Sequence, residues 1–324
     1  MKEKTLKILL ENKGEFISGE YISEKLNISR SAVWKHIKAI KDEGYAIESV
    51  TKKGYKLIDY PDVMESEIIK SKLKTNIIGK EIIYFETIDS TNDYAKKIAK
   101  KSSEGTIVIS EEQTKGKGRM GRFWHSSKKD GIYMSIILKP DILPNDAPII
   151  TQIAGLSVVK ALNKLNVDAK IKWPNDILIN NKKVCGILTE MSIEIDRIDY
   201  IVLGIGINVK TLDFSEDIKN IATSILKEGY NLNRLDIITL VLDEFENLYL
   251  DYINTKNKQI IANMCKEYSA LIGKDIYVIQ FNDRKRAKCI DINKEGNLIV
   301  QYEDGSIKEL ISGEVSIRGE SEYV

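Results

Sequence analysis

The sequence is short of the side chains from which many enzymes build metal centres and nucleophilic triads. It holds 2 histidines, His36 and His125, and 3 cysteines in 324 residues. A histidine-rich metal site is thereby excluded, and Cys185, Cys265 and Cys289 lie too far apart for zinc-site spacing. A Ser-His-Asp triad would need one of the two histidines, and neither is flanked by a nucleophile signature. The odd cysteine count, with no disulfide framework, indicates reduced thiols and a cytoplasmic protein.

Long apolar runs and an excess of charge of either sign are also missing. No apolar run approaches the length of a membrane span, and residues 1–10 lack a small-residue cleavage site, so neither a membrane anchor nor a signal peptide is expected. The 49 Lys and Arg residues balance 48 Asp and Glu, for a net charge of +1. Any surface for nucleic acid must therefore come from local segregation of charge. The length predicts two or three domains.

What the chain does have is a glycine-rich, cationic stretch over residues 115–122, with three glycines and four cations. Glycines let backbone N–H groups approach a ligand, and the cations supply charge for a phosphate or carboxylate. Gly116, Gly118 and Gly121 also fit the dinucleotide fingerprint, but polar, turn-like residues follow where that motif needs a helix. A P-loop is excluded because Arg and Phe follow Gly121. A solvated basic hairpin loop is the alternative interpretation.

The beginning of the chain has the pattern of a winged helix-turn-helix. A short amphipathic helix precedes two further helices, over residues 19–26 and 30–43, with Ser18 and Ser29 as their N-caps. The apolar positions of the last helix fall on one face. Residues 46–58 then alternate like two strands around a basic turn, as expected of a wing.

We expect residues 1–60 to form a DNA-binding domain. They hold 12 Lys and Arg against 9 Asp and Glu, and the last of the three helices leaves a polar, basic face outward. The alternative is a small helical domain that serves protein contacts only. The side chains expected to contact DNA are Ser29, Arg30, Ser31, Trp34, Lys35, Lys38, Lys52 and Lys53.

In the middle of the chain, polar residues stand at the ends of predicted strands. Ser90 and Thr91 follow a β-prone run, where one of them either caps the next helix or hydrogen-bonds a polar ligand. Residues 170–176 contain a rigid Trp-Pro step flanked by Lys and Asp, so they form a strand end or a loop. Gly204 and Gly206 interrupt an apolar strand, which often marks the close approach of a ligand or another backbone.

Taken in order, these segments resemble the bifunctional biotin–protein ligases that also act as biotin operon repressors. Any one segment is a weak signal, but the ordered set is specific and covers nearly the whole chain. The residues that carry the resemblance are Asp89, Ser90, Thr91, Asn92, Gln113, residues 116–122, Trp124, residues 172–176, Lys183, Gly186, residues 204–208 and residues 312–318.

The resemblance implies an α+β multidomain chain. Residues 1–60 would be the winged helix-turn-helix, and residues 65–270 a central mixed α/β ligase domain, similar to class II aminoacyl-tRNA synthetases, that binds biotin and ATP. Residues 271–324 would form a small C-terminal SH3-like β-barrel. Short β-prone runs separated by closely spaced turns in this last segment agree with a barrel.

The resemblance also implies the reaction. Biotin, ATP and Mg²⁺ would give biotinoyl-5'-AMP, and the biotin would pass to a lysine of the biotin carboxyl carrier protein of acetyl-CoA carboxylase or a related carboxylase. Biotinoyl-AMP would act as corepressor, favouring a homodimer on operator DNA; no membrane partner is expected. Because the biotin carboxylate itself attacks the α-phosphate, the reaction needs alignment and positive charge rather than a protein nucleophile.

The family's roles transfer to the matching positions. Arg119 and Lys183 would be the catalytic residues, at the reacting carboxylate and phosphate. The biotin-binding set would be Ser90, Thr91, Asn92, Gln113, Lys117, Gly118, Arg119, Lys183, Gly186 and Gly204. The ATP-binding set would be Arg119, Arg122, Trp124, Lys172, Asn175, Asp176, Asn208 and Arg318. Asp176 would also hold the magnesium that accompanies ATP.

One position departs from the family pattern. Lys117 stands where the family usually has Arg, so the positive charge is kept but the planar guanidinium fork is lost.

Two alternative functions are compatible with the same fold. A ligand-sensing transcription factor without catalysis would not need the predicted catalytic cations. A ligase for lipoate or octanoate would not need the polar set at Ser90, Thr91 and Gln113, because a lipoyl head makes no comparable hydrogen bonds.

Overall fold

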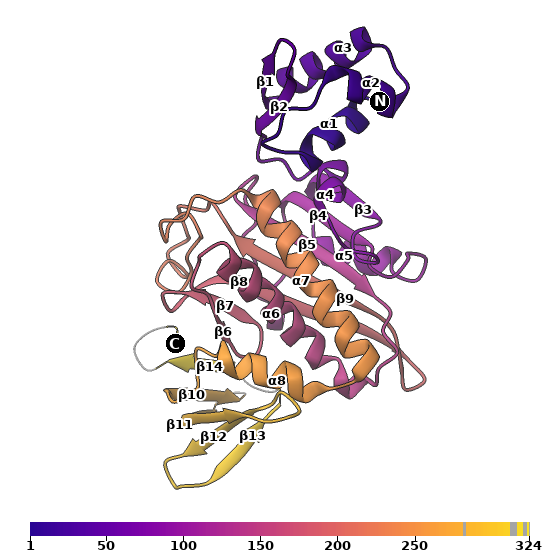
Figure 1. The fold of residues 1–324 in the computed structure, drawn as a ribbon. Coiled ribbons are helices and arrows are strands. Elements are labelled where there is room, and N and C mark those ends of the chain that lie inside the picture. The colour runs from indigo at the N-terminus through magenta and orange to yellow at the C-terminus, as the bar shows by residue number, and fades with distance from the viewer. Residues whose placement is uncertain (281–282, 312–315, 320–322, 324) are drawn as a thin grey trace. The chain divides into compact units, whose positions relative to one another are not determined.

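The chain forms two compact units. The computed structural model describes residues 1–280, 283–311, 316–319 and 323, and the units are Met1–Lys74 and Thr75–Val324 (Figure 1). The first unit consists of α1 (Lys2–Glu11), α2 (Gly19–Leu26), α3 (Arg30–Asp42), β1 (Ala46–Val50), β2 (Gly54–Asp59) and α4 (Ser66–Lys72).

The helices of the first unit begin at the capping residues that the sequence predicts. The Ser18 and Ser29 hydroxyls each accept a hydrogen bond from the amide three residues on, at 3.0 and 3.2 Å. Val33, Ile37 and Ile40 are buried, so the apolar face of α3 packs inward. β1 and β2 pair antiparallel as the expected hairpin. The three helices and the wing are thus confirmed.

A seven-stranded mixed sheet forms the centre of the second unit, in the order β3-β4-β5-β9-β8-β7-β6. Its pairs are antiparallel except β3 with β4. The elements of this part are β3 (Ile82–Ile88), α5 (Thr91–Ile98), β4 (Ile107–Gln113), the 3₁₀ turn η1 (Arg119–Gly121), β5 (Gly131–Leu138), the 3₁₀ turn η2 (Pro144–Asp146), α6 (Pro148–Lys164), β6 (Lys170–Lys172), β7 (Asp176–Ile179), β8 (Lys182–Glu194), β9 (Arg197–Asn208), α7 (Arg234–Thr255) and α8 (Lys258–Glu267).

Helices cover both faces of this sheet. On one face, Ala95 of α5 packs in a buried cluster with Val202 of β9. On the other face, Thr151 of α6 hydrogen-bonds at 2.7 Å to Thr189 of β8. Thr189 is paired with Leu203, which follows Val202 on β9. Successive side chains of a strand point to opposite faces, so α5 and α6 lie on opposite sides. α7 packs beside α6 (Figure 1). The strand ends between these layers are left open for a site.

The end of the chain forms a five-stranded antiparallel sheet in the order β13-β12-β11-β10-β14. Its strands are β10 (Asp275–Gln280), β11 (Asp283–Ile292), β12 (Leu298–Tyr302), β13 (Ile307–Leu310) and β14 (Ser316–Gly319). The turn between β11 and β12 anchors it: the Gly296 carbonyl accepts hydrogen bonds from Gln152 Nε2 at 2.7 Å and Trp173 Nε1 at 3.0 Å. A side chain at Gly296 would collide with Gln152, at 2.4 Å. The turn therefore reaches the loop that holds Trp173.

The predicted fold class is confirmed: a winged helix-turn-helix, a mixed α/β domain and a small antiparallel β domain follow one another. Predicted helix ends are met within a few residues; α5, expected from Asp93, begins at Thr91 because Ser90 is its cap. Residues 312–315, part of the predicted last-strand motif, lie outside the described residues. Among the residues that the structure describes, no helix combines the length and apolarity needed to cross a membrane.

A buried ion pair near the start of α7 gives a test of this packing. Arg234 is fully buried; it donates to Glu111 Oε2 at 2.6 Å and to the Gly131 carbonyl at 3.1 Å. We expect Arg234→Met to cost about 3–5 kcal/mol in the free energy of unfolding, because Glu111 loses its partner while buried. Urea denaturation measures this. The double variant with Glu111→Gln should recover part of the loss, and equal stability of Arg234→Met and the unchanged chain would contradict the account.

Candidate active site

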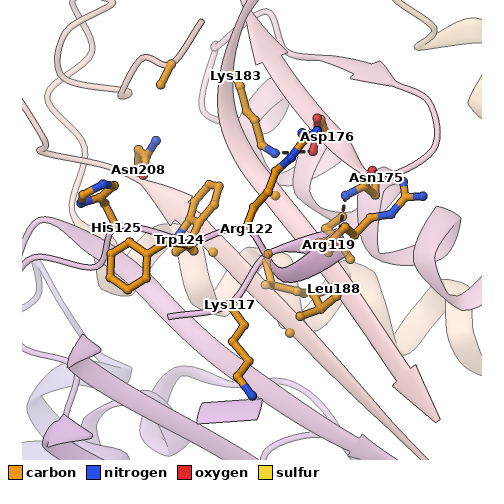
Figure 2. Close-up of a pocket in the computed structure, with 18 of the residues that line it drawn as sticks. Lys117, Arg119, Arg122, Trp124, His125, Asn175, Asp176, Lys183, Leu188 and Asn208 are labelled. Carbon is orange, nitrogen blue, oxygen red and sulfur yellow. Dashed lines mark hydrogen bonds and ion pairs between the residues drawn. The ribbon is translucent and has the colours of Figure 1, made fainter. Parts of the chain in front are cut away.

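One cavity of about 200 Å³ lies where the central sheet, the glycine-rich loop and the C-terminal residues meet (Figure 2). It brings together residues from seven strands, from the start of α5 and from several loops that are far apart in the sequence. The predicted site residues that line it are Thr91, Asn92, Gln113, Lys117, Gly118, Arg119, Arg122, Trp124, Lys172, Asn175, Asp176, Lys183, Gly186, Gly204 and Asn208.

Two predicted residues are not among the described lining residues. Ser90 is buried, and its hydroxyl accepts from the Asp93 amide at 3.3 Å and caps α5. The simple capping interpretation of Ser90 therefore describes its contact here. Arg318 pairs with Tyr277 between β14 and β10, but its side chain lies outside the described part of the chain.

A hydrogen-bond network forms the polar end of the cavity. The Gln113 side-chain oxygen accepts from the amide and the hydroxyl of Thr91, at 2.9 and 3.0 Å, and its nitrogen donates to Ser126 Oγ at 2.9 Å. The Ser135 hydroxyl bridges Thr91 and Asn92 at 2.8 and 2.6 Å. These side chains are held in fixed orientations, which suits the recognition of a polar, uncharged ligand head.

The glycine-rich loop folds back on itself beside this end. The Gly118 amide donates to the Arg122 carbonyl at 2.8 Å, and the Trp124 amide to the Gly116 carbonyl at 2.9 Å. A side chain at Gly116 would lie 2.3 Å from the Trp124 carbonyl, so the close approach requires glycine. No α-helix opens from the loop, since only the single 3₁₀ turn η1 precedes β5. The dinucleotide interpretation is therefore wrong.

Lys117, which departs from the family pattern, is paired with a carboxylate. Its ammonium lies 2.7 Å from Asp93 Oδ2, and Figure 2 shows it pointing away from Arg119 and Trp124. Lys96 also binds Asp93, at 3.0 Å. Partial burial alone would raise the pKa of Asp93, but the hydrogen bonds from Lys117 and Lys96 outweigh it and lower that pKa. The lysine thus ties the loop to α5.

Cations gather at the opposite end of the cavity around one buried carboxylate. Lys183 Nζ lies 2.6 Å from Asp176 Oδ1, and Arg119 donates to Asn175 Oδ1 at 2.8 Å. Burial would raise the pKa of Asp176, but the charge and hydrogen bond of Lys183 hold it below its usual value. Burial lowers the pKa of Arg119, although the negative charge of Asp176 acts in the opposite direction. A guanidinium titrates far above neutral pH, so Arg119 stays charged near an anion.

Trp124 lies against backbone that carries no side chain. A Cβ at Gly206 would lie 2.5 Å from its Nε1, and one at Gly186 would lie 2.9 Å from its ring. The Lys183 ammonium is 5.4 Å from the centre of the ring. The interruptions of β8 and β9 by glycine therefore make room for an aromatic surface inside the cavity. The sequence predicted a ligand or another backbone beside Gly206, and a tryptophan side chain lies there.

The cavity is also lined by residues outside the predicted binding sets, and only some of these belong to the motif segments that the sequence indicated. The residues outside those sets are Met120, Phe123, His125, Met134, Trp173, Pro174, Ile187, Leu188, Ile205, Gly206, Phe214, Ile218, Ile221, Ala222, Ile317 and Tyr323. Apolar residues spaced through the polar segment 210–222 were an available signal for four of them. Nothing local to Tyr323 indicates that it meets residues 172 and 176.

The first unit presents the predicted DNA-contacting residues on its surface. All eight are exposed. Trp34 is 56% exposed, with the Lys38 ammonium 5.8 Å from its ring centre. Arg30 forms an ion pair with Glu20 of α2. A groove runs between α2, α3 and the hairpin, and it is lined by Arg30, Trp34, Lys38, Lys41 and Lys52 among others. The polar, basic face of α3 thus borders the wing.

Comparison with known proteins agrees with this organisation. Residues 84–208 match the Biotin/lipoate A/B protein ligase family, residues 2–56 an HTH domain, and residues 271–318 the Biotin protein ligase C terminal domain. A bifunctional ligase/repressor BirA of Bacillus spizizenii is 39% identical over 98% of both chains. The chain belongs to the bifunctional ligase/repressor family. The Escherichia coli K12 member is 30% identical over 98% of this chain and 99% of its own.

A solved structure supports the same assignment for the second unit of this ligase/repressor. The biotin protein ligase from Aquifex aeolicus, in complex with biotin and ATP, superposes with a TM-score of 0.66 at 29% identity. The match covers 74% of this chain and 100% of the other. This chain therefore shares the ligase fold over the whole length of the Aquifex aeolicus protein.

The contact between Trp124 and Gly206 can be tested directly. We expect Gly206→Ala to displace the Trp124 indole, because the new methyl would overlap Nε1 at 2.5 Å. Emission from Trp124, read in a background with Trp34 and Trp173 replaced by Phe, should shift to longer wavelength as the ring becomes exposed. Gly155→Ala, whose methyl would meet only ordinary contacts of 3.7 Å or more, is the control. An unshifted spectrum for Gly206→Ala would refute the contact.

Proposed function

We propose that this chain is an ATP-dependent biotin–protein ligase that also acts as a biotin-responsive repressor. The observation that carries this is the 39% identity to a bifunctional ligase/repressor over 98% of both chains. An HTH match and a ligase-family match also lie in this one chain, at residues 2–56 and 84–208. The cavity adds the chemistry: a fixed polar end and a cationic end, with an aromatic wall between them.

The polar end binds the ureido head of biotin. Thr91, Asn92 and Gln113 offer donors and acceptors that are already oriented by one another and by Ser135. A lipoyl or octanoyl chain offers these polar groups no hydrogen bond, whereas each one that the ureido head forms with them contributes about 0.5–1.5 kcal/mol. The network therefore supports biotin over the lipoate alternative.

The cationic end activates the carboxylate. The biotin carboxylate oxygen attacks the α-phosphorus of ATP, an O–P bond forms, and the bond to pyrophosphate breaks. Arg119 and Lys183 supply positive charge where negative charge accumulates, which is the largest contribution a protein can make to this step. Trp124 offers its ring to the adenine, while Lys172 and Asn175 hold the nucleotide. Catalysis by histidine is not required.

Asp176 fits the role of magnesium ligand. Magnesium usually takes one or two carboxylates and completes its shell with phosphates and water. Among the described residues no group of three acidic, His or Cys side chains could hold a metal alone, and Asp176 is the acidic residue of the cavity wall. Its lowered pKa keeps it ionised at neutral pH. The cation would neutralise phosphate charge that the lysines leave uncompensated.

The second half of the reaction depends more on keeping water away from the mixed anhydride than on supplying positive charge. The amine of an acceptor lysine attacks the acyl carbon of biotinoyl-AMP, an amide forms, and AMP leaves. The acceptor is the biotin carboxyl carrier protein of acetyl-CoA carboxylase or a related carboxylase. The glycine-rich loop shields the mixed anhydride from water until that acceptor arrives. The exposed Met120 and Phe123 are the apolar surface it would bring to the closed site.

The ligase assignment predicts the effect of removing either cation. Arg119→Ala or Lys183→Ala should slow the labelling of the carrier protein by about a hundredfold or more, the usual cost of losing one such transition-state contact. Mass spectrometry of the protein incubated with biotin and MgATP should show bound biotinoyl-AMP for the unchanged chain. Lys182→Ala, an exposed neighbour of Lys183, is the control. Labelling at full rate by both alanine variants would exclude the mechanism.

Repression follows if the same ligand controls assembly. Biotinoyl-AMP, as corepressor, closes the loop and favours a homodimer that places two winged helices on a two-fold operator. The outer edge of β8 between residues 188 and 194 has no strand partner among the described residues, and Met191 and Ile193 are exposed there. An open edge of this kind can pair with a second copy. The site of action is the cytoplasm.

A chain of ion pairs connects the loop to this edge. Lys117 of the loop binds Asp93, Asp93 binds Lys96 at 3.0 Å, and Lys96 binds Glu190 of β8 at 2.8 Å. Glu190 also accepts from Asn92 at the polar end of the cavity, at 2.9 Å. Closure of the loop on a ligand therefore has a continuous route to the open edge of the sheet, which supports the coupling of ligand binding to dimerisation.

The repressor assignment predicts two changes in operator binding. Gel shifts should show tighter binding with biotin and MgATP than without them; equal affinity would exclude the coupling. Lys38→Ala should weaken binding and reduce the slope of log affinity against log salt by about 1, the loss of one phosphate contact. Lys25→Ala, an exposed lysine of α2 outside the groove, should leave that slope unchanged.

A further inference from the structure

Tyr323 contacts two groups that the ligase reaction needs for the nucleotide. Its hydroxyl donates to Asp176 Oδ2, and its backbone carbonyl accepts a hydrogen bond of 2.7 Å from the Lys172 ammonium. The same ammonium lies 3.2 Å from the centre of the Tyr323 ring. One residue thus covers a predicted phosphate-binding lysine and the predicted magnesium ligand at the same time.

These contacts occupy the polar groups that a nucleotide would use. Lys183 binds Asp176 Oδ1 at 2.6 Å, so both carboxylate oxygens already have a partner. Lys172 is only 2% exposed. A cation at Oδ2 would compete with the Tyr323 hydroxyl for the lone pairs of that oxygen. A phosphate oxygen that binds the Lys172 ammonium would have to replace the Tyr323 carbonyl and ring that cover it.

The tyrosine is well seated in this position. It is 5% exposed and packs in a buried cluster with Leu178 and Ala270, with Ile221 against them. It lines the same cavity as Trp124 and Lys183. Its carbonyl oxygen meets Lys172 as a phosphate oxygen would, and its hydroxyl meets Asp176 as a water on a bound cation would. Tyr323 therefore imitates part of the ligand.

We propose that Tyr323 is an intramolecular competitor of MgATP, which must displace it from Lys172 and Asp176 in order to bind. The inference rests on the proposed ligase function, which assigns those two residues to the nucleotide. Competition of this kind lowers the apparent affinity for MgATP by the fraction of molecules in which the site is free. Biotin affinity is unaffected, because Thr91 and Gln113 at the other end do not contact Tyr323.

The experiment compares Tyr323→Ala, Tyr323→Phe and a matched control, Tyr302→Phe in β12, whose residue is not among the described lining residues. Calorimetric titration with a non-hydrolysable MgATP analogue and, separately, with biotin measures the two affinities in the full chain. Tyr323→Ala should bind the analogue about threefold or more tightly, in proportion to the population released. Tyr323→Phe keeps the ring and carbonyl but loses the hydroxyl, so it should show a smaller gain. The control should match the unchanged chain.

An unchanged or weaker affinity for the analogue in Tyr323→Phe and Tyr323→Ala overturns the proposal, because a residue that only supports Lys172 and Asp176 would lower affinity when lost. If Tyr323→Ala fails to fold, as judged by thermal unfolding, Tyr323→Phe decides alone. Biotin-dependent exchange of pyrophosphate into ATP separates this outcome from the parent assignment. Exchange with unaltered nucleotide affinity refutes competition only, whereas absence of exchange in every variant, the unchanged chain included, refutes the ligase function.

Discussion

Compensation of one buried negative charge organises the reactive end of this molecule. Asp176 begins β7, where burial would favour its neutral form, yet Lys183 from the next strand and the hydroxyl of Tyr323 stabilise the carboxylate. An isolated charge in that position would cost several kcal/mol, so these partners are a condition of the fold as well as of the chemistry. One of these partners, Lys183, also brings an ammonium group to the proposed phosphate site.

A second constraint is the absence of side chains on the floor of the cavity. Gly204 leaves room for Asn92, whose oxygen would otherwise lie 2.3 Å from a Cβ, and Gly186 and Gly206 leave room for Trp124. The strands β8 and β9 pair across this region with regular register, so the glycines create width without breaking the ladder. A recognition surface made of backbone and anchored polar side chains results, with an aromatic wall that a purely aliphatic strand could not offer.

In the proposed function, ligand binding and assembly would use the same elements, so that one chain could combine catalysis with repression. The glycine-rich loop is tied to α5 through Lys117 and Asp93, and α5 is tied to the open half of β8 through Lys96 and Glu190. The lysine at position 117 is suited to this arrangement, since a single ammonium is all that the Asp93 carboxylate requires, while a bidentate guanidinium fork is not used.

The sequence by itself determined the elements and their order. Caps at Ser18 and Ser29, the periodicity of α3, and the turns of the hairpins depend on neighbours a few residues away, and so local pattern predicts them. The glycine-rich loop also stood out through composition, whereas Lys172 and Lys183 were assigned through the resemblance to a family. Tertiary structure decided the distant partners: Tyr323 on Asp176, and Gly296 on Gln152 and Trp173. The reason is physical, because contacts between residues more than a hundred positions apart depend on the path of the whole chain, which periodicity and spacing do not encode.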